Sequence, residues 1–191
     1  LNNTGYAIAP GHRLRLALAT SNWPMAWPTP DNGALTLDSE NSSLELPILD
    51  PCASDTQPTF APPEHAPPIP TDVLREPGHE RVITRDIVEG ETALWLKKDS
   101  GRQRLSHNRI EAEESTTERY LIKDHDPLSA RAEYTAHQVI ARDTWETRTV
   151  SSLSVSCNYT HLILEAELTA YEGEDQVFSR TWRNEIPRDG L

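Results

Sequence analysis

Cysteine, glycine and long apolar runs are scarce in this chain. Its 191 residues include two cysteines, one methionine and eight glycines. Two cysteines are too few for a disulfide framework, and apolar runs of only a handful of residues exclude a transmembrane helix. No signal-peptide pattern, with a basic start and an apolar stretch, is present in the sequence. We therefore expect a protein of the reducing cytoplasm that has no membrane partner.

The sequence is also poor in motifs that carry chemistry. It contains no Gly-x-Ser-x-Gly nucleophile turn, no glycine-rich phosphate loop and no Cys-x-x-Cys pair, and its seven histidines are dispersed. Residues 124–126 place a histidine between two aspartates, but Pro127 follows, which favours a turn. The acidic residues of 172–175 are interpreted as solvated turn charges and not as calcium ligands. We predict no catalytic residue, no metal and no cofactor, and the net charge of −12 argues against a nucleic-acid partner.

What the chain does contain is alternation of apolar and polar side chains, which is typical of β-strands with one buried face. Leu14, Leu16 and Leu18 share one side of residues 13–20. Residues 160–170 alternate in the same way, and a glycine-containing turn at 171–175 leads into a partner strand at 177–182. Further strands are predicted at 81–88, 91–98 and 145–155. Together they predict an antiparallel meander, and such sheets pack in pairs to bury their apolar faces.

Residues 129–141 fit two interpretations. Their alanines suit a helix, whereas Ala130, Ala132 and Tyr134 would share one face of a strand. We choose a strand because the neighbouring segments are strands. The fold class that follows is all-β, with an antiparallel β-sandwich over residues 1–191 as a single domain.

Residues 50–70 differ from the rest of the chain because they carry seven of its fifteen prolines. Proline cannot take part in a ladder or in a helix interior. We therefore predict an extended crossover along the domain surface, with a recognition arm for a proline-binding module as the alternative. Cys52 lies in this segment. Cys157 follows Leu153 and Val155 at period two and is interpreted as a small buried residue, with a Cys52–Cys157 disulfide as the alternative.

A loop rich in tryptophan and proline follows the first predicted strand. Residues 22–30 combine two tryptophans with three prolines. Buried, the rings would close one end of the sandwich; exposed, they would pack against another domain or stack on a sugar ring. We take Asn22, Trp23, Pro24, Trp27 and Pro28 as the candidate domain-contact residues.

Three stretches of the chain carry a family resemblance. The first runs from Pro-Gly-His-Arg at 10–13 through Asn-Trp-Pro at 22–24, with short strands at 35–37 and 44–47 after it. The second is Asp-Pro-Leu-Ser-Ala-Arg-Ala-Glu at 126–133, and the third spans 171–189 and includes Ile-Pro-Arg-Asp at 186–189. In this order they resemble the C-terminal β-domain of cocaine-esterase-like and X-prolyl dipeptidyl-peptidase serine hydrolases, the CocE/NonD family.

The resemblance implies a jelly-roll sandwich of galactose-binding-like architecture attached to an upstream α/β-hydrolase domain with a Ser-Asp-His triad. No triad motif matches a position of this sequence, so the implied role is non-catalytic. Such a domain would buttress the catalytic domain and wall part of a cleft that receives acyl, ester or X-prolyl substrates. A carbohydrate- or ligand-binding module is the alternative, and a structural adaptor is a third interpretation.

The start of the sequence departs from the family pattern. Family members have strands ahead of the Gly-His-Arg segment, whereas ten residues precede Gly11 here. We therefore expect a domain shortened at its N-terminus. Its unpaired sheet edge would favour a homo-oligomer or an exchange of strands between copies.

Overall fold

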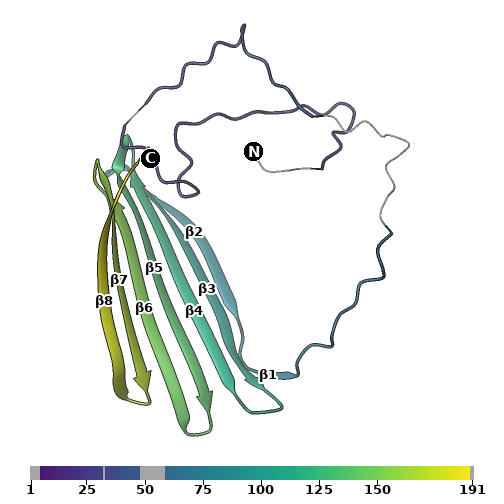
Figure 1. The fold of residues 1–191 in the computed structure, drawn as a ribbon, viewed down its shortest axis with the longest axis vertical. Coiled ribbons are helices and arrows are strands. Elements are labelled where there is room, and N and C mark those ends of the chain that lie inside the picture. The colour runs from purple at the N-terminus through teal and green to yellow at the C-terminus, as the bar shows by residue number, and fades with distance from the viewer. Residues whose placement is uncertain (1–4, 32, 48–58, 190–191) are drawn as a thin grey trace.

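The computed structural model describes residues 5–31, 33–47 and 59–189, and its ordered body is one antiparallel sheet (Figure 1). The described residues form no helix. The eight strands are β1 (Thr71–Arg75), β2 (Gly78–Asp86), β3 (Glu91–Leu105), β4 (Glu111–Lys123), β5 (Asp126–Arg142), β6 (Trp145–Cys157), β7 (His161–Glu172) and β8 (Asp175–Pro187).

The strands pair in chain order from β3 to β8, as a meander does. At the other edge, β2 pairs with the first part of β3 and β1 with its last residues. The predicted strands at 81–88, 91–98, 145–155, 160–170 and 177–182 are confirmed, and residues 129–141 are a strand, part of β5. The two predicted turns are also confirmed, with His125 at a φ of 58° and Gly173 at a φ of 58°.

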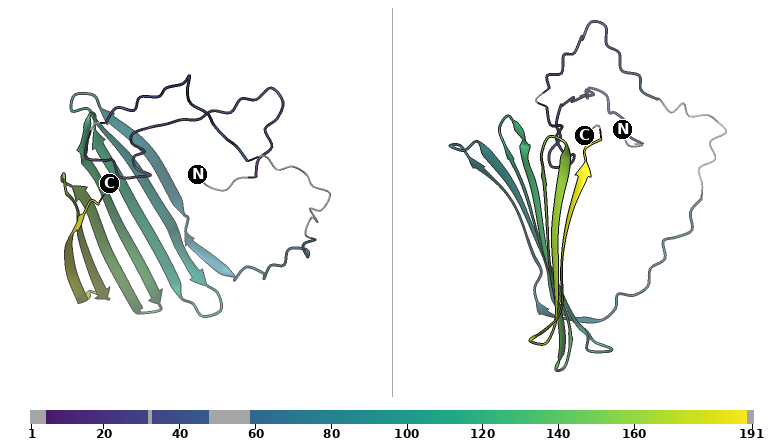
Figure 2. Two further views of the ribbon diagram at one scale, coloured as in Figure 1. Left: turned by 45° about the horizontal axis from the view of Figure 1, so that its top comes forward. Right: turned by 60° about the vertical axis from the view of Figure 1, so that its left-hand side comes forward.

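Residues 5–31 and 33–47 form no strand and wind beside one end of the sheet (Figures 1 and 2). The strands expected at 13–20, 35–37 and 44–47 are therefore not formed. Leu14, Leu16 and Leu18 remain 53–55% exposed. Alternation gives a strand one apolar face, but a ladder also needs a neighbouring backbone, and no described strand pairs with residues 13–20.

The proline-rich crossover is seen in part. Residues 59–70 carry neither helix nor strand and stay exposed as they lead to the start of β1, as the prolines predict. Cys52 lies outside the described residues. Cys157, at the end of β6, is a free thiol, and it is half-buried where we expected burial.

The strand registers divide the sheet into two unlike faces, because successive side chains of a strand point to opposite sides. One face, called the apolar face, carries a cross-strand row of Ile83, Leu94, Tyr120, Ala132, Val155 and Leu164. The opposite face, called the polar face, carries Trp95, Arg119, Glu133, Ser154, Glu165 and Arg183 in the neighbouring row. This contrast is what one layer of a sandwich shows.

Little of the chain is buried. Among the described residues the buried hydrophobic side chains are Leu121 and four alanines, and no large side chain is fully buried. The accessible surface is 15734 Å², whereas a compact protein of 21.5 kDa exposes roughly 9,200 Å². The all-β class and the antiparallel arrangement are confirmed; the jelly-roll order of strands stays a prediction. No second layer of described residues covers most of the apolar face.

Candidate functional site

The tryptophan- and proline-rich loop, here the Trp/Pro loop (residues 20–31), is the part of the N-terminal segment that returns to the sheet. Its chain reverses after Asn22, whose carbonyl oxygen accepts a hydrogen bond from the Ala26 N–H at 3.0 Å. The Trp23–Pro24 peptide bond is cis. The reversal brings the two tryptophans together at the end of the sheet where β3 begins and β4 ends.

Three aromatic rings form a cluster on the apolar face. The Trp23 and Trp27 ring centroids lie 4.8 Å apart at an interplanar angle of 85°. Trp23 also meets Tyr120 of β4 edge to face, at 6.0 Å and 80°. Both indole Nε1 atoms are buried without an acceptor among the described atoms. Edge-to-face packing fixes the loop on the sheet, and it leaves no pair of coplanar rings for a sugar.

Tyr120 is itself held by its own strand. Its hydroxyl donates to the Glu118 carboxylate at 2.6 Å. This hydrogen bond, followed by burial and the negative charge of Glu118, raises the pKa of Tyr120 to about 12. The phenol therefore stays neutral and keeps its ring fixed beneath Trp23 across the physiological range.

Arg188, just after β8, ties the loop to the opposite side of the sheet. The residue is 6% exposed. Its Nη2 donates to the Pro28 carbonyl oxygen, and its Nη1 donates to the Asn158 carbonyl oxygen at 3.1 Å. Its backbone N–H also bonds to the Thr160 carbonyl oxygen at 2.9 Å. One buried guanidinium thus joins the Trp/Pro loop, the β6–β7 turn and the end of β8.

A second tether comes from the same β6–β7 turn. The Tyr159 hydroxyl donates to the Asp31 carboxylate at 3.1 Å. That bond raises the pKa of Tyr159. Tyr159 is 59% exposed, so this contact is the weaker of the two tethers because water competes for both groups.

Two hollows flank the Trp/Pro loop. The larger, of about 440 Å³, lies between the loop and the first strands of the apolar face. It is lined by Ser21, Asn22, Trp23, Pro24, Ile83, Thr92, Leu94, Tyr120 and Ile122. The smaller, of about 200 Å³, is lined by the far end of the loop and the β4–β5 turn. The larger hollow has the aromatic and aliphatic lining of a surface that accepts apolar groups.

The structure brings the predicted contact residues into one place. Trp23, Pro24 and Trp27 are half-buried, Pro28 is buried and Asn22 is exposed. Their partners could not be predicted from the sequence. Tyr120 sits in an ordinary strand pattern, and the only signal for Arg188 was its position in the Ile-Pro-Arg-Asp stretch of the family resemblance.

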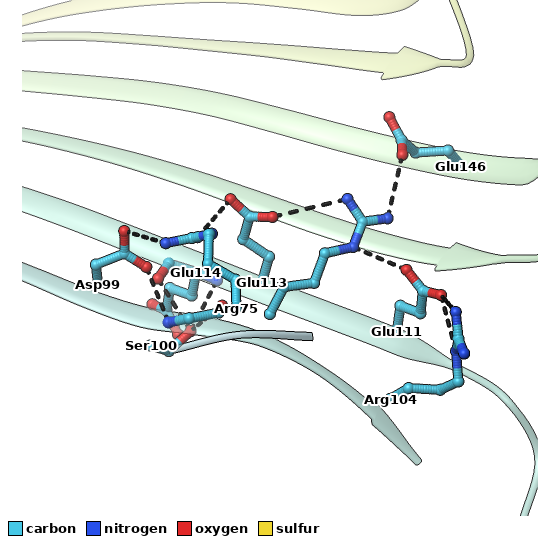
Figure 3. Close-up of polar contacts among 10 residues, drawn as sticks. Arg75, Asp99, Ser100, Arg104, Glu111, Glu113, Glu114 and Glu146 are labelled. Atoms are coloured by element: carbon cyan, nitrogen blue, oxygen red, sulfur yellow. Dashed lines mark hydrogen bonds and ion pairs between the residues drawn. The ribbon is translucent and has the colours of Figure 1, made fainter. Parts of the chain in front are cut away.

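The polar face carries a series of ion pairs between neighbouring strands. At the end of β1, the Arg75 guanidinium bonds to the Asp99 carboxylate at 2.7 Å and to the Glu113 carboxylate at 2.8 Å (Figure 3). The hydrogen bond from Arg75 is the main cause that lowers the pKa of Asp99. The same pairing raises the pKa of Arg75.

The ion pairs continue across the neighbouring strands (Figure 3). Glu111 accepts from Arg104 at 2.5 Å and from Arg102 at 2.8 Å, and Arg102 lies 3.6 Å from Glu146 of β6. The Arg104 hydrogen bond, followed by that of Arg102, lowers the pKa of Glu111. Charges that are mutually paired and open to water stabilise little individually, but they mark this face as the one that solvent covers.

Within the described ranges, no group of three or more His, Cys, Asp or Glu side chains is placed to hold a metal ion. The acidic turn residues at 172–175 accordingly form no such group. The described residues also include no helix long and apolar enough to cross a membrane.

The described residues thus define an all-β fold with an aromatic loop packed on its apolar face. Residues 1–84 match the family model of the X-Pro dipeptidyl-peptidase C-terminal non-catalytic domain. Over these residues, fewer than half of the 191, the chain is similar to that domain, as the resemblance predicted. The match includes the Trp/Pro loop, β1 and most of β2, and it ends before β3. No curated protein and no solved structure matches the chain significantly.

Proposed function

We propose that this chain is an accessory β-domain of an α/β-hydrolase of the X-prolyl dipeptidyl-peptidase or acyl-esterase type. Its role is to buttress the catalytic domain and to form part of the wall of the substrate cleft. The observation that carries the proposal is the bare apolar face next to a segment that matches a non-catalytic C-terminal domain. An exposed apolar surface that extends over several strands marks an interaction site. In the resembled family, the partner for such a surface would be the catalytic domain of the same polypeptide.

The docking surface begins at the Trp/Pro loop. Met25 at the tip of the loop is 82% exposed, and Ile83 beside the larger hollow is 68% exposed. Both adjoin the aromatic cluster, so an apolar partner surface would extend the existing packing of Trp23 on the sheet. The ion-paired polar face then points to solvent. This orientation assigns the contact role to the loop residues Asn22, Trp23, Pro24, Trp27 and Pro28.

The experiment is to measure binding of this chain to the α/β-hydrolase segment encoded in the same reading frame. Ile83 and Val82 are neighbours on β2 that point to opposite faces, and both are exposed, at 68% and 45%. Ile83→Asp should weaken the binding by about tenfold or more, because loss of roughly 1.4 kcal/mol of apolar burial is a factor of ten. Val82→Asp on the polar face is the matched control and should leave the affinity within about twofold.

A fluorophosphonate probe completes the test. It should label a serine of the hydrolase segment and none within these 191 residues. A reading frame without an α/β-hydrolase, or equal effects of the two β2 substitutions, would overturn the proposal.

Two further properties are proposed with this function. The compartment is the cytoplasm, in keeping with the free thiol of Cys157. A second copy of the chain is a further partner, bound through an exposed sheet edge. The carbohydrate-binding alternative is the weaker one, because the half-buried indole rings pack on each other and on Tyr120, which leaves less ring surface for a sugar.

A further inference from the structure

The turn between β2 and β3 exposes two adjacent aliphatic side chains. Ile87 is 84% exposed and Val88 is 88% exposed. They belong to the connection 87–90, here the β2–β3 tip, which joins Asp86 of β2 to its cross-strand partner Glu91 of β3. The tip lies at the end of the sheet that also holds the Trp/Pro loop, and it forms an outer corner of the sheet there (Figure 2).

Local structure does not account for these two residues. Tight turns favour glycine, asparagine, aspartate, serine and proline, whereas β-branched residues favour strands. Gly90, at a φ of 66°, is the residue type that its place in the turn requires. Ile87 and Val88 are not, and both remain in water. A pair of residues that breaks a local rule without a gain in the fold is expected at a functional site.

Hydrogen bonds within the turn hold the tip in one conformation. The Asp86 carboxylate accepts from the Val88 N–H at 2.8 Å and from the Glu89 N–H at 3.0 Å. These bonds, that of Glu89 first, lower the pKa of Asp86, so its carboxylate stays ionised and continues to accept both. A turn that is already ordered loses little conformational freedom when it binds a partner.

The neighbouring β4–β5 turn supports the tip from the side. The Asp124 N–H donates to the Gly90 carbonyl oxygen at 2.9 Å. The Lys123 ammonium lies 3.2 Å from the Glu89 carboxylate. The Arg85 guanidinium lies 2.6 Å from the Asp124 carboxylate. The two turns are therefore joined, and the aliphatic pair stands on a fixed support.

The charge around the tip restricts the kind of partner. Carboxylates outnumber cations there by two: Asp86, Glu89, Glu91 and Asp124 stand against Arg85 and Lys123. An acidic surround is repelled by the anionic surface of a membrane, and residues 85–91 contain none of the aromatic side chains typical of interfacial anchors. The same charge is attracted to a protein surface on which basic residues surround an apolar pocket.

We propose that the β2–β3 tip inserts Ile87 and Val88 into an apolar pocket with a basic rim on the catalytic domain of the same polypeptide. This inference rests on the proposed function and adds a second contact to it, because the tip protrudes beyond the apolar face that carries the Trp/Pro loop. Burial of one such side chain shifts an equilibrium by about tenfold or more. The tip thus adds affinity and fixes the orientation of the sheet on its partner.

Substitution of the aliphatic pair tests the contact through the affinity for the hydrolase segment of the same reading frame. The tip variant, with Ile87→Ser and Val88→Ser together, should bind about a hundredfold more weakly. It should keep the unfolding midpoint of the parent chain, because both side chains are exposed and turns accept serine. Val177→Ser is the matched control, since Val177 is 60% exposed at the opposite end of the sheet, and its affinity should stay within about twofold. Equal affinities of the tip variant and the control would overturn the proposal.

Thiol labelling tests the insertion itself, in a background without other cysteines. Val88→Cys should react with a maleimide at least about tenfold more slowly in the full polypeptide than in this 191-residue chain, because the pocket covers it. Glu174→Cys, in the exposed β7–β8 turn, is the control and should react equally in both. A Val88→Cys thiol that reacts equally in both would contradict the insertion.

These outcomes separate this inference from the proposed function. If Ile83→Asp weakens the binding and the tip variant does not, the proposed function stands and the tip contact is refuted. If the hydrolase segment does not bind at all, both fail. Binding should also weaken as the salt concentration rises, and an affinity independent of salt would refute the basic rim. Sedimentation of the chain with phosphatidylcholine vesicles that is lost in the tip variant would overturn the assignment to a protein pocket.

Discussion

Replacing Arg188 with alanine should release the Trp/Pro loop from the end of the sheet. The Arg188 guanidinium is buried and joins two segments that lie 160 residues apart, through its bond to the Pro28 carbonyl oxygen. A second bond holds the Asn158 carbonyl oxygen. No other described side chain bridges the loop and the end of β8, so the substitution removes the main tether from that side.

The size of the effect follows from these contacts. A hydrogen bond that involves a charged group contributes about 1.5–3 kcal/mol, so two of them contribute about 3 kcal/mol or more. Against this stands the cost of burying a guanidinium that has no ion pair among the described residues. We expect a net loss of about 2 kcal/mol, which increases the undocked population of the loop roughly thirtyfold.

Hydrogen exchange measures this population directly. In Arg188→Ala the amides of residues 22–28 should exchange about thirtyfold faster, and denaturant unfolding should show a lower midpoint. Arg183→Ala is the control, because Arg183 makes only exposed ion pairs and should cost at most about 1 kcal/mol. If the amides of residues 22–28 exchange at the same rate in both variants, Arg188 does not hold the loop.

Three further predictions concern the sheet. Gly101→Ala should lower the free energy of unfolding by about 3 kcal/mol or more, because the φ of Gly101 is +72° and an added Cβ would lie 2.2 Å from the Arg75 carbonyl oxygen of β1. Gly173→Ala is the control: at a φ of +58°, with nothing near the added Cβ, it should cost about 1 kcal/mol in the same chemical denaturation experiment. The pKa of Glu111 is lower in the folded state than in the unfolded state. Its contribution to stability is therefore complete above the unfolded pKa and is lost as the pH falls through the folded pKa. Glu111→Gln should make the free energy of unfolding less dependent on pH in this acidic range. The pKa of Tyr120 is raised to about 12, so its contribution to stability is lost as the pH rises from its unfolded pKa towards 12. Tyr120→Phe should remove the last step of a spectrophotometric tyrosine titration. An unchanged titration would contradict the Glu118 hydrogen bond.

Much of the sheet could be predicted because its information is local. The alternating residues at 160–170 and the glycine turn after them specify a hairpin without reference to the rest of the chain. The ambiguous segment at 129–141 was settled by the same logic, since a strand between two strands completes the meander. Residues 13–20 show where this logic ends. Their alternation is as regular as that of β7, yet no described strand of the sheet pairs with them.

The candidate site was predicted only in its residue types. Two tryptophans among prolines indicated a contact loop, but nothing in the sequence connects Trp23 with Tyr120 or Pro28 with Arg188. Those partners are distant in the chain and are brought together by the order of six hairpin-linked strands. Likewise, residue patterns show that each strand has an apolar side, but not that all these sides lie together uncovered.

The strand class, the turns, the lack of a catalytic motif and the residues of the loop could be predicted, because side-chain alternation and turn chemistry act over a few neighbouring residues. Contacts between distant segments determine which edge of the sheet stays open, which face lacks cover and which groups anchor the loop. These properties depend on strand register and on contacts across more than a hundred residues, and no local pattern encodes them.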